Sequence, residues 1–310
     1  AKLTSMIDDI RIWQDRDGAT PADDLKDILV ELGLSGKALG VEEEAYGLTG
    51  RSLRLLDRAL ADDFRMQDAS MLVSRQRLVK SPAEITYVER AAELGDDALK
   101  VAWETAGPGV FEGEILAGMQ GAVFAGGGDY PGNEFIIGSG RYAQLCRYFT
   151  GRRHLDAQDQ LTLEFAGVYR RYHAALMRTV PVGGATDHHR AMHAACADAL
   201  AACEDAVRPG NTMGTVFDAH AKVLDDAGFG EHRLNACGYS LGTTFAPNWM
   251  DWPMFYTGNP QVMAPGMVFF LHMILMDSTR DQAMTLGRTV VVTETGCRSL
   301  SALSDDLIVV

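Results

Sequence analysis

The pattern of apolar and polar positions changes character near residue 75. Before that point, the short strand-like pieces IRIW and KALGVE alternate with PADDLKDILVELGL and LTGRSLRLLDRALA, in which apolar residues recur at i, i+3, i+4 and i+7. This spacing places the apolar side chains on one face of a helix. Pro21 stands early in the first helical piece, where proline is tolerated. Residues 1–75 are therefore predicted to form a small α/β domain in the order strand, helix, strand, helix.

After residue 76 the pattern becomes that of long helices and long antiparallel strands. A linker is followed by a helix start, because Ser81, Pro82 and Glu84 form a typical N-terminal signature. Helical spacing predicts helices over residues 84–106, 112–125, 186–207 and 213–227, and RPG and GFG mark the ends of the last two. Apolar runs predict strands over residues 134–138, 159–166, 168–180, 236–246, 266–276 and 285–293, with a hairpin turn at AGVY. Residues 76–310 are thus predicted to form an α+β domain in which helices cover a curved antiparallel sheet.

The composition is that of a globular protein with a large core. The 310 residues are 47% hydrophobic, enough for one large domain and a smaller one. A net charge of −14 and a pI near 4.9 argue against a nucleic-acid partner, because phosphate binding needs clustered Lys and Arg. No apolar run approaches the roughly 20 residues of a membrane span, and the start shows no signal-peptide pattern. The five cysteines form no CxxC pair, which favours a cytoplasmic location.

Seven pieces of the chain between about residues 76 and 300 occur in the order and spacing of a known family. They are VKSPAEITYVERAAELGDDAL, GSGRYAQLCRY, DQLTLEFAGVYRRYHAALMRTV, VRPGNTMGTVFDAH, ACGYSLG, APGMVFFLHM and LGRTVVVTETG. Together they resemble the pita-bread family, which contains methionine aminopeptidase, Xaa-Pro aminopeptidase, prolidase and creatinase. The resemblance implies a pita-bread catalytic domain over residues 76–310, preceded by a partial creatinase-like α/β domain over residues 1–75.

The resemblance also implies where a metal site would lie. Metal-dependent members of the family hold two ions with two Asp, one His and two Glu on the curved sheet. In this chain the five ligand positions fall on Glu164, Ala175, Tyr239, His272 and Gly287. One carboxylate, one imidazole and one phenol cannot balance two divalent ions. We therefore expect neither a metal nor another cofactor at this site.

Two branches of the family are similar to the chain around its central hairpin. TLEFAGVYRRYHAALMRT resembles the hairpin of creatinase, a metal-free hydrolase, but Arg147, Met177 and Tyr239 stand where creatinase has catalytic residues. EFAGVYRRYH and GYSLGTTFAPNW resemble segments of ectoine hydrolase, in which a His is usual at the position of Arg147. The identity of the substrate therefore does not transfer by resemblance.

Four side chains are candidates for catalysis. Glu164 is a carboxylate on an otherwise apolar strand, so it needs a task as general base or nucleophile, or a salt-bridge partner. His272 and His173 could transfer protons near neutral pH, or could be hydrogen-bonded residues of the core. Tyr239 could donate to a developing oxyanion, or could pack with its hydroxyl group hydrogen-bonded.

Five further side chains are candidates for binding a substrate. Trp249, Asp251 and Trp252 lie in FAPNWMDWPMFY, a segment that could enclose a cationic or amidinium ligand or could form a dimer interface. Arg147 and Arg178 are natural partners for a substrate carboxylate, although Arg178 could instead support the sheet.

These observations predict a metal-independent hydrolase that cleaves a C–N bond in a small carboxylate-bearing compound similar to ectoine, creatine or an Xaa-Pro peptide. Two alternatives stay open: a non-catalytic pita-bread module that binds a ligand or partner, and an Xaa-Pro-type metallopeptidase. Because relatives in the creatinase branch are commonly homodimers, the resemblance also implies a homodimer. The expected partner is a small-molecule substrate, with neither nucleic acid nor membrane.

Overall fold

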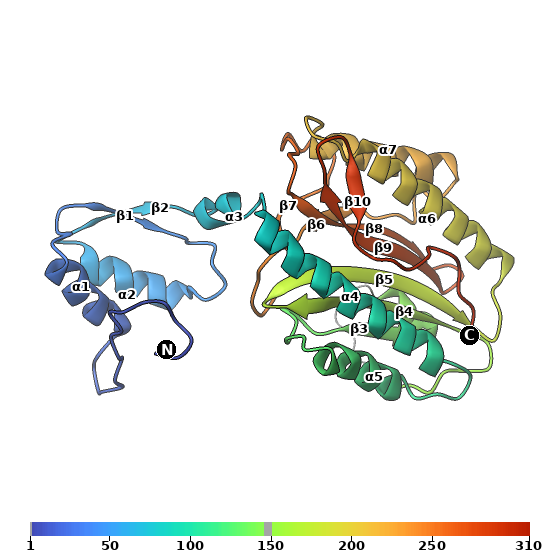
Figure 1. Cartoon of the computed structure of the whole chain (residues 1–310), viewed down its shortest axis with the longest axis horizontal. Helices are drawn as coiled ribbons and strands as arrows, with labels where there is room; N and C mark the ends of the chain where they lie inside the picture. The colour runs from blue at the N-terminus through green and yellow to red at the C-terminus, as the bar shows by residue number, and fades with distance from the viewer. Residues whose placement is uncertain (1, 146–150) are drawn as a thin grey trace. The chain divides into compact units, whose positions relative to one another are not determined.

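The computed structural model of the chain describes residues 2–145 and 151–310 and divides into two compact units, Ala1–Arg75 and Gln76–Val310. The elements of the first unit are α1 (Pro21–Glu31), β1 (Ala38–Val41), α2 (Gly50–Leu60) and β2 (Arg65–Asp68) (Figure 1). The short α3 (Leu72–Gln76) follows and ends at the first residue of the second unit. The side chains of Thr20 and Thr49 cap α1 and α2 by accepting backbone N–H groups of the first turn. β1 and β2 pair in parallel.

One predicted strand of the first unit is wrong and one strand was missed. Residues 10–13, predicted as a strand, form none; Ile12 is 80% exposed and Arg11 instead pairs with Glu31 of α1. The strand β2 has the sequence RMQD, which carries almost no apolar signal. Its pairing with β1 rests on backbone hydrogen bonds, which the apolar pattern does not reveal.

The second unit is built on one eight-stranded antiparallel sheet with the order β3-β4-β5-β9-β8-β6-β7 and with β10 paired to β9. Its strands are β3 (Ile136–Ser139), β4 (Asp159–Tyr169), β5 (Tyr172–Val182), β6 (Gly238–Ser240), β7 (Asp251–Met254), β8 (Val268–Asp277), β9 (Gln282–Val292) and β10 (Cys297–Ser299). Its helices are α4 (Pro82–Thr105), α5 (Glu112–Ala125), α6 (Asp187–Ala206), α7 (Met213–Asp226) and the 3₁₀ turn η1 (Gly140–Gln144). The predicted helices are therefore confirmed, including the capping box of Ser81 and Glu84.

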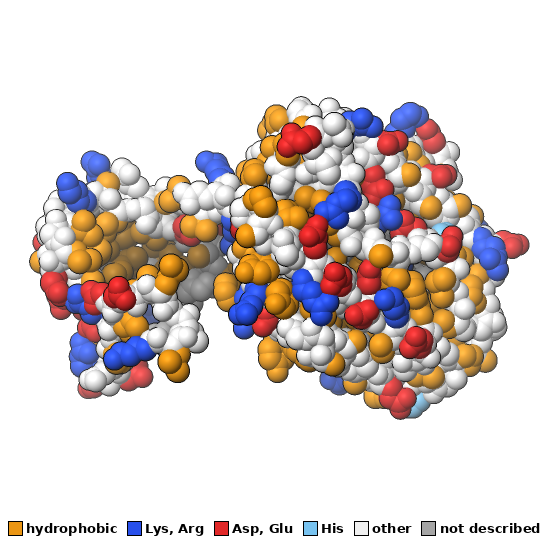
Figure 2. Space-filling model, in the orientation of Figure 1, with side chains coloured by type: hydrophobic (Ala, Val, Ile, Leu, Met, Phe, Trp, Pro, Cys, Tyr) orange, Lys and Arg blue, Asp and Glu red, His pale blue; other side chains and the backbone are white. Residues whose placement is uncertain are grey.

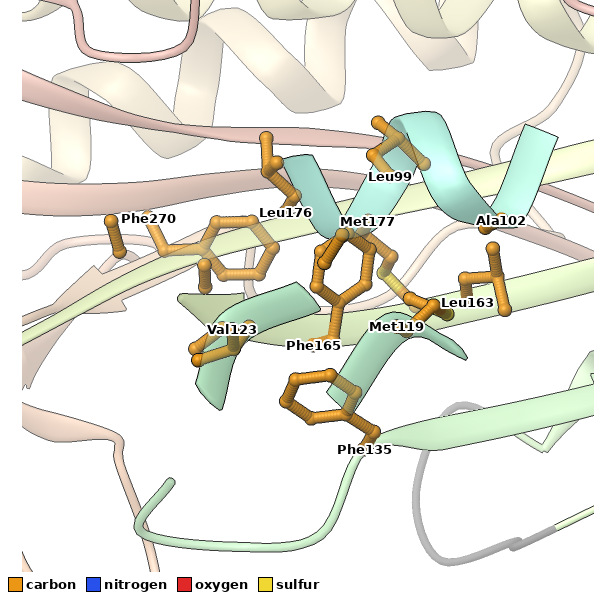
Figure 3. Packing of buried hydrophobic residues seen from close by; sticks show 14 of the residues in the cluster. Leu99, Ala102, Met119, Val123, Phe135, Leu163, Phe165, Leu176, Met177 and Phe270 are labelled. Carbon is orange, nitrogen blue, oxygen red and sulfur yellow. The ribbon is translucent and has the colours of Figure 1, made fainter. Parts of the chain in front are cut away.

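Two hydrophobic clusters fix the helices to the sheet. The α4–α5 pair packs with β4 and β5, and Figure 3 shows Phe165 of β4 near Phe135, with Met119 of α5 and Leu99 of α4 in the same cluster. The α6–α7 pair packs with β8 and β9 through a second cluster. Figure 1 shows the two helix pairs on the two halves of the sheet. Neighbouring residues of each strand point to opposite faces of the sheet.

The hairpin of β4 and β5 corrects the predicted turn. AGVY continues β4, and the turn is made by Arg170 and Arg171, whose φ angles are 51° and 68°. AGVY contains small residues because α4 packs closely on β4 at this point, and these residues were mistaken for those of a turn. A Cβ atom at Gly167 would lie 1.9 Å from the carbonyl oxygen of Ala91 in α4, so only glycine permits this close approach.

The strand predicted over residues 236–246 is also shorter than expected, because β6 covers only Gly238–Ser240. Its pairing with β7 shifts register between Tyr239 and Ser240, so the chain leaves the sheet for a loop that returns as β7. None of the described helices is long and apolar enough to cross a membrane. On the face shown in Figure 2, positive and negative side chains are interspersed over the second unit.

Candidate active site

The candidate site is a row of side chains that share one face of the sheet. Glu164 of β4 lies directly opposite Met177 of β5, and Met177 in turn lies opposite Gly287 of β9. Gly287 lies opposite His272 of β8. Because directly opposed residues of antiparallel strands share a face, these side chains form one row across the sheet.

The two remaining ligand positions of the family, Ala175 and Tyr239, lie on the same face of the sheet. Ala175 is two residues from Met177, and Tyr239 lies opposite Phe270, which is two residues from His272. Alternation along each strand therefore brings them to the same side. The five positions singled out in the sequence thus converge on one face of the sheet, although they come from β4, β5, β6, β8 and β9.

A hydrogen-bonded chain joins Glu164 to Tyr239. The hydroxyl group of Tyr239 donates to Oε1 of Glu164 at 3.2 Å, and it accepts the indole N–H of Trp249 at 2.9 Å. Glu164 is 9% exposed, Tyr239 2% and Trp249 1%. A buried carboxylate with a hydrogen-bond donor beside it is a typical arrangement of a reactive or structural acid, and this one lies within the row described above.

His272 lies next to the series of hydrogen bonds that joins Trp249, Tyr239 and Glu164. Its ring centroid is 5.7 Å from that of Tyr239 and 5.5 Å from that of Phe270. Phe270 covers Gly287, because a Cβ atom added to Gly287 would lie 2.9 Å from two carbons of the Phe270 ring. Phe270 and Met177 belong to one hydrophobic cluster (Figure 3), so the site combines one carboxylate with apolar walls.

Both ring nitrogens of His173 have hydrogen-bond partners within the protein. It is fully buried in β5; its Nε2 accepts the backbone N–H of Gly132 at 2.9 Å, so Nδ1 carries the proton. The carbonyl oxygen of Gly242 and the hydroxyl oxygen of Thr244 lie 3.4 and 3.3 Å from Nδ1. Burial lowers the pKa of His173 to about 4, which keeps the ring neutral at physiological pH. These contacts are those of a hydrogen-bonded core residue, and a catalytic role for His173 stays a prediction.

Arg178 points away from the site. It follows Met177 in β5 and so lies on the opposite face, where its guanidinium donates to the carbonyl oxygens of Met177 and Gly287 at 2.9 and 2.7 Å. It also pairs with Asp305 at 3.1 Å. Burial lowers its pKa to about 10. Arg178 thus ties β5, β9 and the C-terminal segment together behind the row, and it does not reach Glu164.

The predicted aromatic box is divided between two clusters. Trp249 belongs to the first hydrophobic cluster, whereas Trp252 packs against the second. The carboxylate of Asp251 is bound by the guanidinium of Arg77, with Nε–Oδ2 at 2.8 Å and Nη2–Oδ1 at 2.9 Å. Asp251 is therefore paired with an arginine of its own unit, and its role in binding a substrate stays a prediction. The remaining candidate, Arg147, lies outside the described residues.

Comparison with known proteins decides the family. A family model described as metallopeptidase family M24 matches residues 86–294, about two thirds of the chain. The chain belongs to family M24. It is 30% identical over 278 residues to an uncharacterized hydrolase/peptidase of Sinorhizobium fredii, covering 88% of this chain and 70% of that protein. It is 26% identical over 294 residues to an ectoine hydrolase of Halomonas elongata, covering 91% and 72%.

Solved structures of the family confirm the fold of this M24 protein. An X-Pro aminopeptidase from Thermotoga maritima superimposes with a TM-score of 0.85 at 21% identity, covering 93% of this chain and 78% of that one. An Xaa-Pro dipeptidase from Bacillus anthracis gives 0.85 at 22% identity, covering 94% and 79%. The predicted pita-bread fold is confirmed, and so is the predicted class of enzyme, a hydrolase of C–N bonds, at the level of the family.

The residues of this M24 chain do not fit the pair of metal ions that the family name implies. The five positions offer one carboxylate, from Glu164, one imidazole and one phenol, and the Phe270 ring covers Gly287, where a ligand side chain would project. Over residues 2–145 and 151–310, no three His, Cys, Asp or Glu side chains are placed to share an ion. Two divalent ions need several anionic oxygen ligands, which this face does not supply.

Two sets of interactions that stabilise the strands of the candidate site were not predicted from the sequence. Lys80 of the linker before α4 is 4% exposed, and its Nζ donates to the carbonyl oxygen of Leu78 at 3.0 Å and to Ser240 Oγ at 3.4 Å. Burial lowers its pKa to about 8, although Asp251 and Glu84 partly oppose this. Lys80 thereby anchors the strand that carries Tyr239. A lysine within LVKSP looks like an ordinary exposed residue, so only its partners reveal the role.

A row of threonine hydroxyls forms the second support. Oγ1 of Thr179 lies 2.8 Å from Oγ1 of Thr162 and 3.0 Å from Oγ1 of Thr285, and these buried residues are two positions along from the row of Glu164. The hydroxyls join β4, β5 and β9 side by side. They fix the register of these strands, and therefore the position of Glu164, more firmly than apolar contacts alone would.

Proposed function

We propose that the protein is a metal-independent hydrolase that cleaves a C–N bond in a small carboxylate-bearing compound of the ectoine, creatine or Xaa-Pro type. One observation supports this most: a buried carboxylate, Glu164, receives the Tyr239 hydroxyl group at 3.2 Å on the face where the family's ligand positions fall. Side chains must then perform what two ions perform elsewhere in the family.

The proposed reaction uses Glu164 as general base or nucleophile. As a base, its carboxylate takes a proton from water while the water oxygen attacks the carbon of the C–N bond; as a nucleophile, it attacks that carbon itself and water later releases the product. His272 is assigned to proton transfer to the departing nitrogen. Tyr239 fixes one carboxylate oxygen by its hydrogen bond, so the carboxylate is held in one orientation for the reaction.

The charge of the site favours a cationic C–N group. Besides Glu164, Tyr239 and His272, the described part of this face carries the apolar side chains of Ala175, Met177 and Phe270. A single carboxylate with apolar walls attracts a delocalised cation, and an amidine such as ectoine carries one. The relative named ectoine hydrolase supports this choice. A role for Arg147 in holding the substrate carboxylate stays a prediction.

The alternative is an Xaa-Pro-type metallopeptidase, which the relatives named Xaa-Pro dipeptidase favour. It requires that Mn, Co or Zn bind in stoichiometric amount to the purified protein. The side chains described above do not favour a metallopeptidase. Elemental analysis of protein that is equilibrated with each metal and then desalted distinguishes the metallopeptidase from the metal-independent hydrolase.

The test of the proposal is hydrolysis of ectoine, creatine and Xaa-Pro dipeptides by the purified protein and by Glu164→Gln. We expect turnover of one of these compounds by the wild type and loss of at least about a hundredfold in the variant, the scale of general acid–base catalysis. Glu112→Gln is the matched control, because Glu112 is also a buried carboxylate but lies at the start of α5 and accepts the backbone N–H of Arg153 at 2.8 Å. Full activity of Glu164→Gln would refute the assigned centre.

We further propose that the protein is a homodimer. Sedimentation at the mass of twice the 33.7 kDa chain is expected, and a mass of one chain at micromolar concentration would contradict it.

A further inference from the structure

Trp249 sets the direction of the hydrogen bonds at Glu164. Its indole nitrogen is a donor only, so in the 2.9 Å contact the Tyr239 oxygen must accept. The hydroxyl proton of Tyr239 is then directed to an acceptor, Oε1 of Glu164 at 3.2 Å. The order of donation is therefore Trp249 to Tyr239 to Glu164, with the carboxylate at the accepting end.

The loop around Trp249 holds the indole in this position. The backbone N–H of Trp249 donates to Oδ1 of Asn133 at 3.3 Å, and its carbonyl oxygen accepts the Thr244 hydroxyl at 3.4 Å. The backbone of Gly132 packs so closely on this loop that an added Cβ atom would lie 2.8 Å from the nitrogen of Trp249. Gly132 is in turn held by His173. Contacts from two separate segments thus restrict the movement of Trp249.

We propose that Trp249 is a positioning residue that acts on Glu164 through Tyr239, and not a wall of a substrate box. This inference rests on the proposed function, in which Glu164 reacts as a carboxylate. A donor on the phenol oxygen makes the Tyr239 hydroxyl a stronger donor, because successive hydrogen bonds polarise one another. The two hydrogen bonds therefore restrain the carboxylate of Glu164 to one orientation.

The kinetic test is Trp249→Phe, which retains an aromatic ring and removes the N–H group. We expect kcat to fall about tenfold, the effect of one hydrogen bond, and KM to stay within about twofold. Trp103→Phe is the control, because Trp103 lies in α4 and its indole nitrogen has no hydrogen-bond partner over the described residues. An unchanged kcat with a raised KM would overturn the inference and restore the substrate-box role.

A second test needs no turnover and so separates this inference from the proposed function. The chain has four tryptophans, which give four indole N–H signals in a nitrogen–proton NMR spectrum, assigned by single replacement with Phe. We expect the Trp249 signal to follow the ionisation of Glu164 as pH is varied. This titration disappears in Glu164→Gln and in Tyr239→Phe, while the Trp103 signal is unchanged in all three proteins. A Trp249 signal that titrates equally in wild type and Tyr239→Phe would refute the relay, whatever the substrate is.

Discussion

Acid should destabilise the second unit through His173. The folded protein holds this imidazole neutral with a pKa of about 4, whereas the unfolded chain binds a proton near pH 6.5. Between these values the unfolded state binds more protons than the folded one, so stability is complete above pH 6.5 and is lost as pH falls toward 4. Because the same shift keeps His173 neutral near neutral pH, we expect it not to act as an acid in the reaction.

The magnitude follows from the two pKa values. One such group lowers the free energy of unfolding by about 2 kcal/mol between pH 7 and pH 5, because each tenfold difference in proton affinity between the folded and unfolded states corresponds to about 1.4 kcal/mol. The buried His220, whose pKa is also about 4, contributes separately. The comparison must therefore be between the wild type and His173→Gln, which has no group that titrates in this range but retains a polar side chain.

The assay is urea unfolding at pH 7, 6 and 5, followed by tryptophan fluorescence, because three of the four tryptophans lie in the second unit. The wild type should lose about 2 kcal/mol more than His173→Gln on going from pH 7 to pH 5. The control His220→Gln should retain the loss of about 2 kcal/mol that is due to His173. Equal pH dependence in the wild type and His173→Gln would refute the argument that burial holds this ring neutral.

Two further predictions concern the supports of the site. The folded protein loses the proton of Lys80 at a pKa of about 8, whereas the unfolded chain keeps it up to about pH 10.5, so the free energy of unfolding rises with pH. In urea unfolding, the wild type should gain about 2 kcal/mol relative to Lys80→Met between pH 7.5 and 9.5. The control Lys222→Met, at an exposed lysine, should show no such difference from the wild type. Asp251→Asn weakens the pair with Arg77 and should lower the free energy of unfolding by about 2 kcal/mol without changing KM; a raised KM with unchanged stability would instead place Asp251 at the substrate.

Local signals were enough to predict most of the second unit. Helix α4 begins at Ser81 because its cap and Glu84 are adjacent in sequence, and the apolar alternation of β8 and β9 is a property of each strand alone. The misplaced turn at AGVY shows the limit. Gly167 is small because α4 packs against it, and no local pattern distinguishes a glycine needed for close packing from one needed for a turn.

The candidate site was predictable in part for the same reason. Glu164 and His272 are polar residues within apolar strands, so each stands out by itself. The partners of Tyr239, Asp251 and Arg178 depend on tertiary contacts with no local signal: Arg77 meets Asp251 across 174 residues of sequence, and Arg178 meets Asp305 across 127. Such pairs become visible only when the sheet and its loops are assembled.

The central claim, that Glu164 and its neighbours hydrolyse a C–N bond without a metal ion, is tested most directly by the turnover rate of protein stripped with a chelator, measured on the compound that the untreated protein hydrolyses. We predict the same rate before and after chelation, with substoichiometric Mn, Co and Zn in the active protein and no stimulation when they are added. Loss of activity on chelation, with recovery on adding one of these metals, would contradict the account.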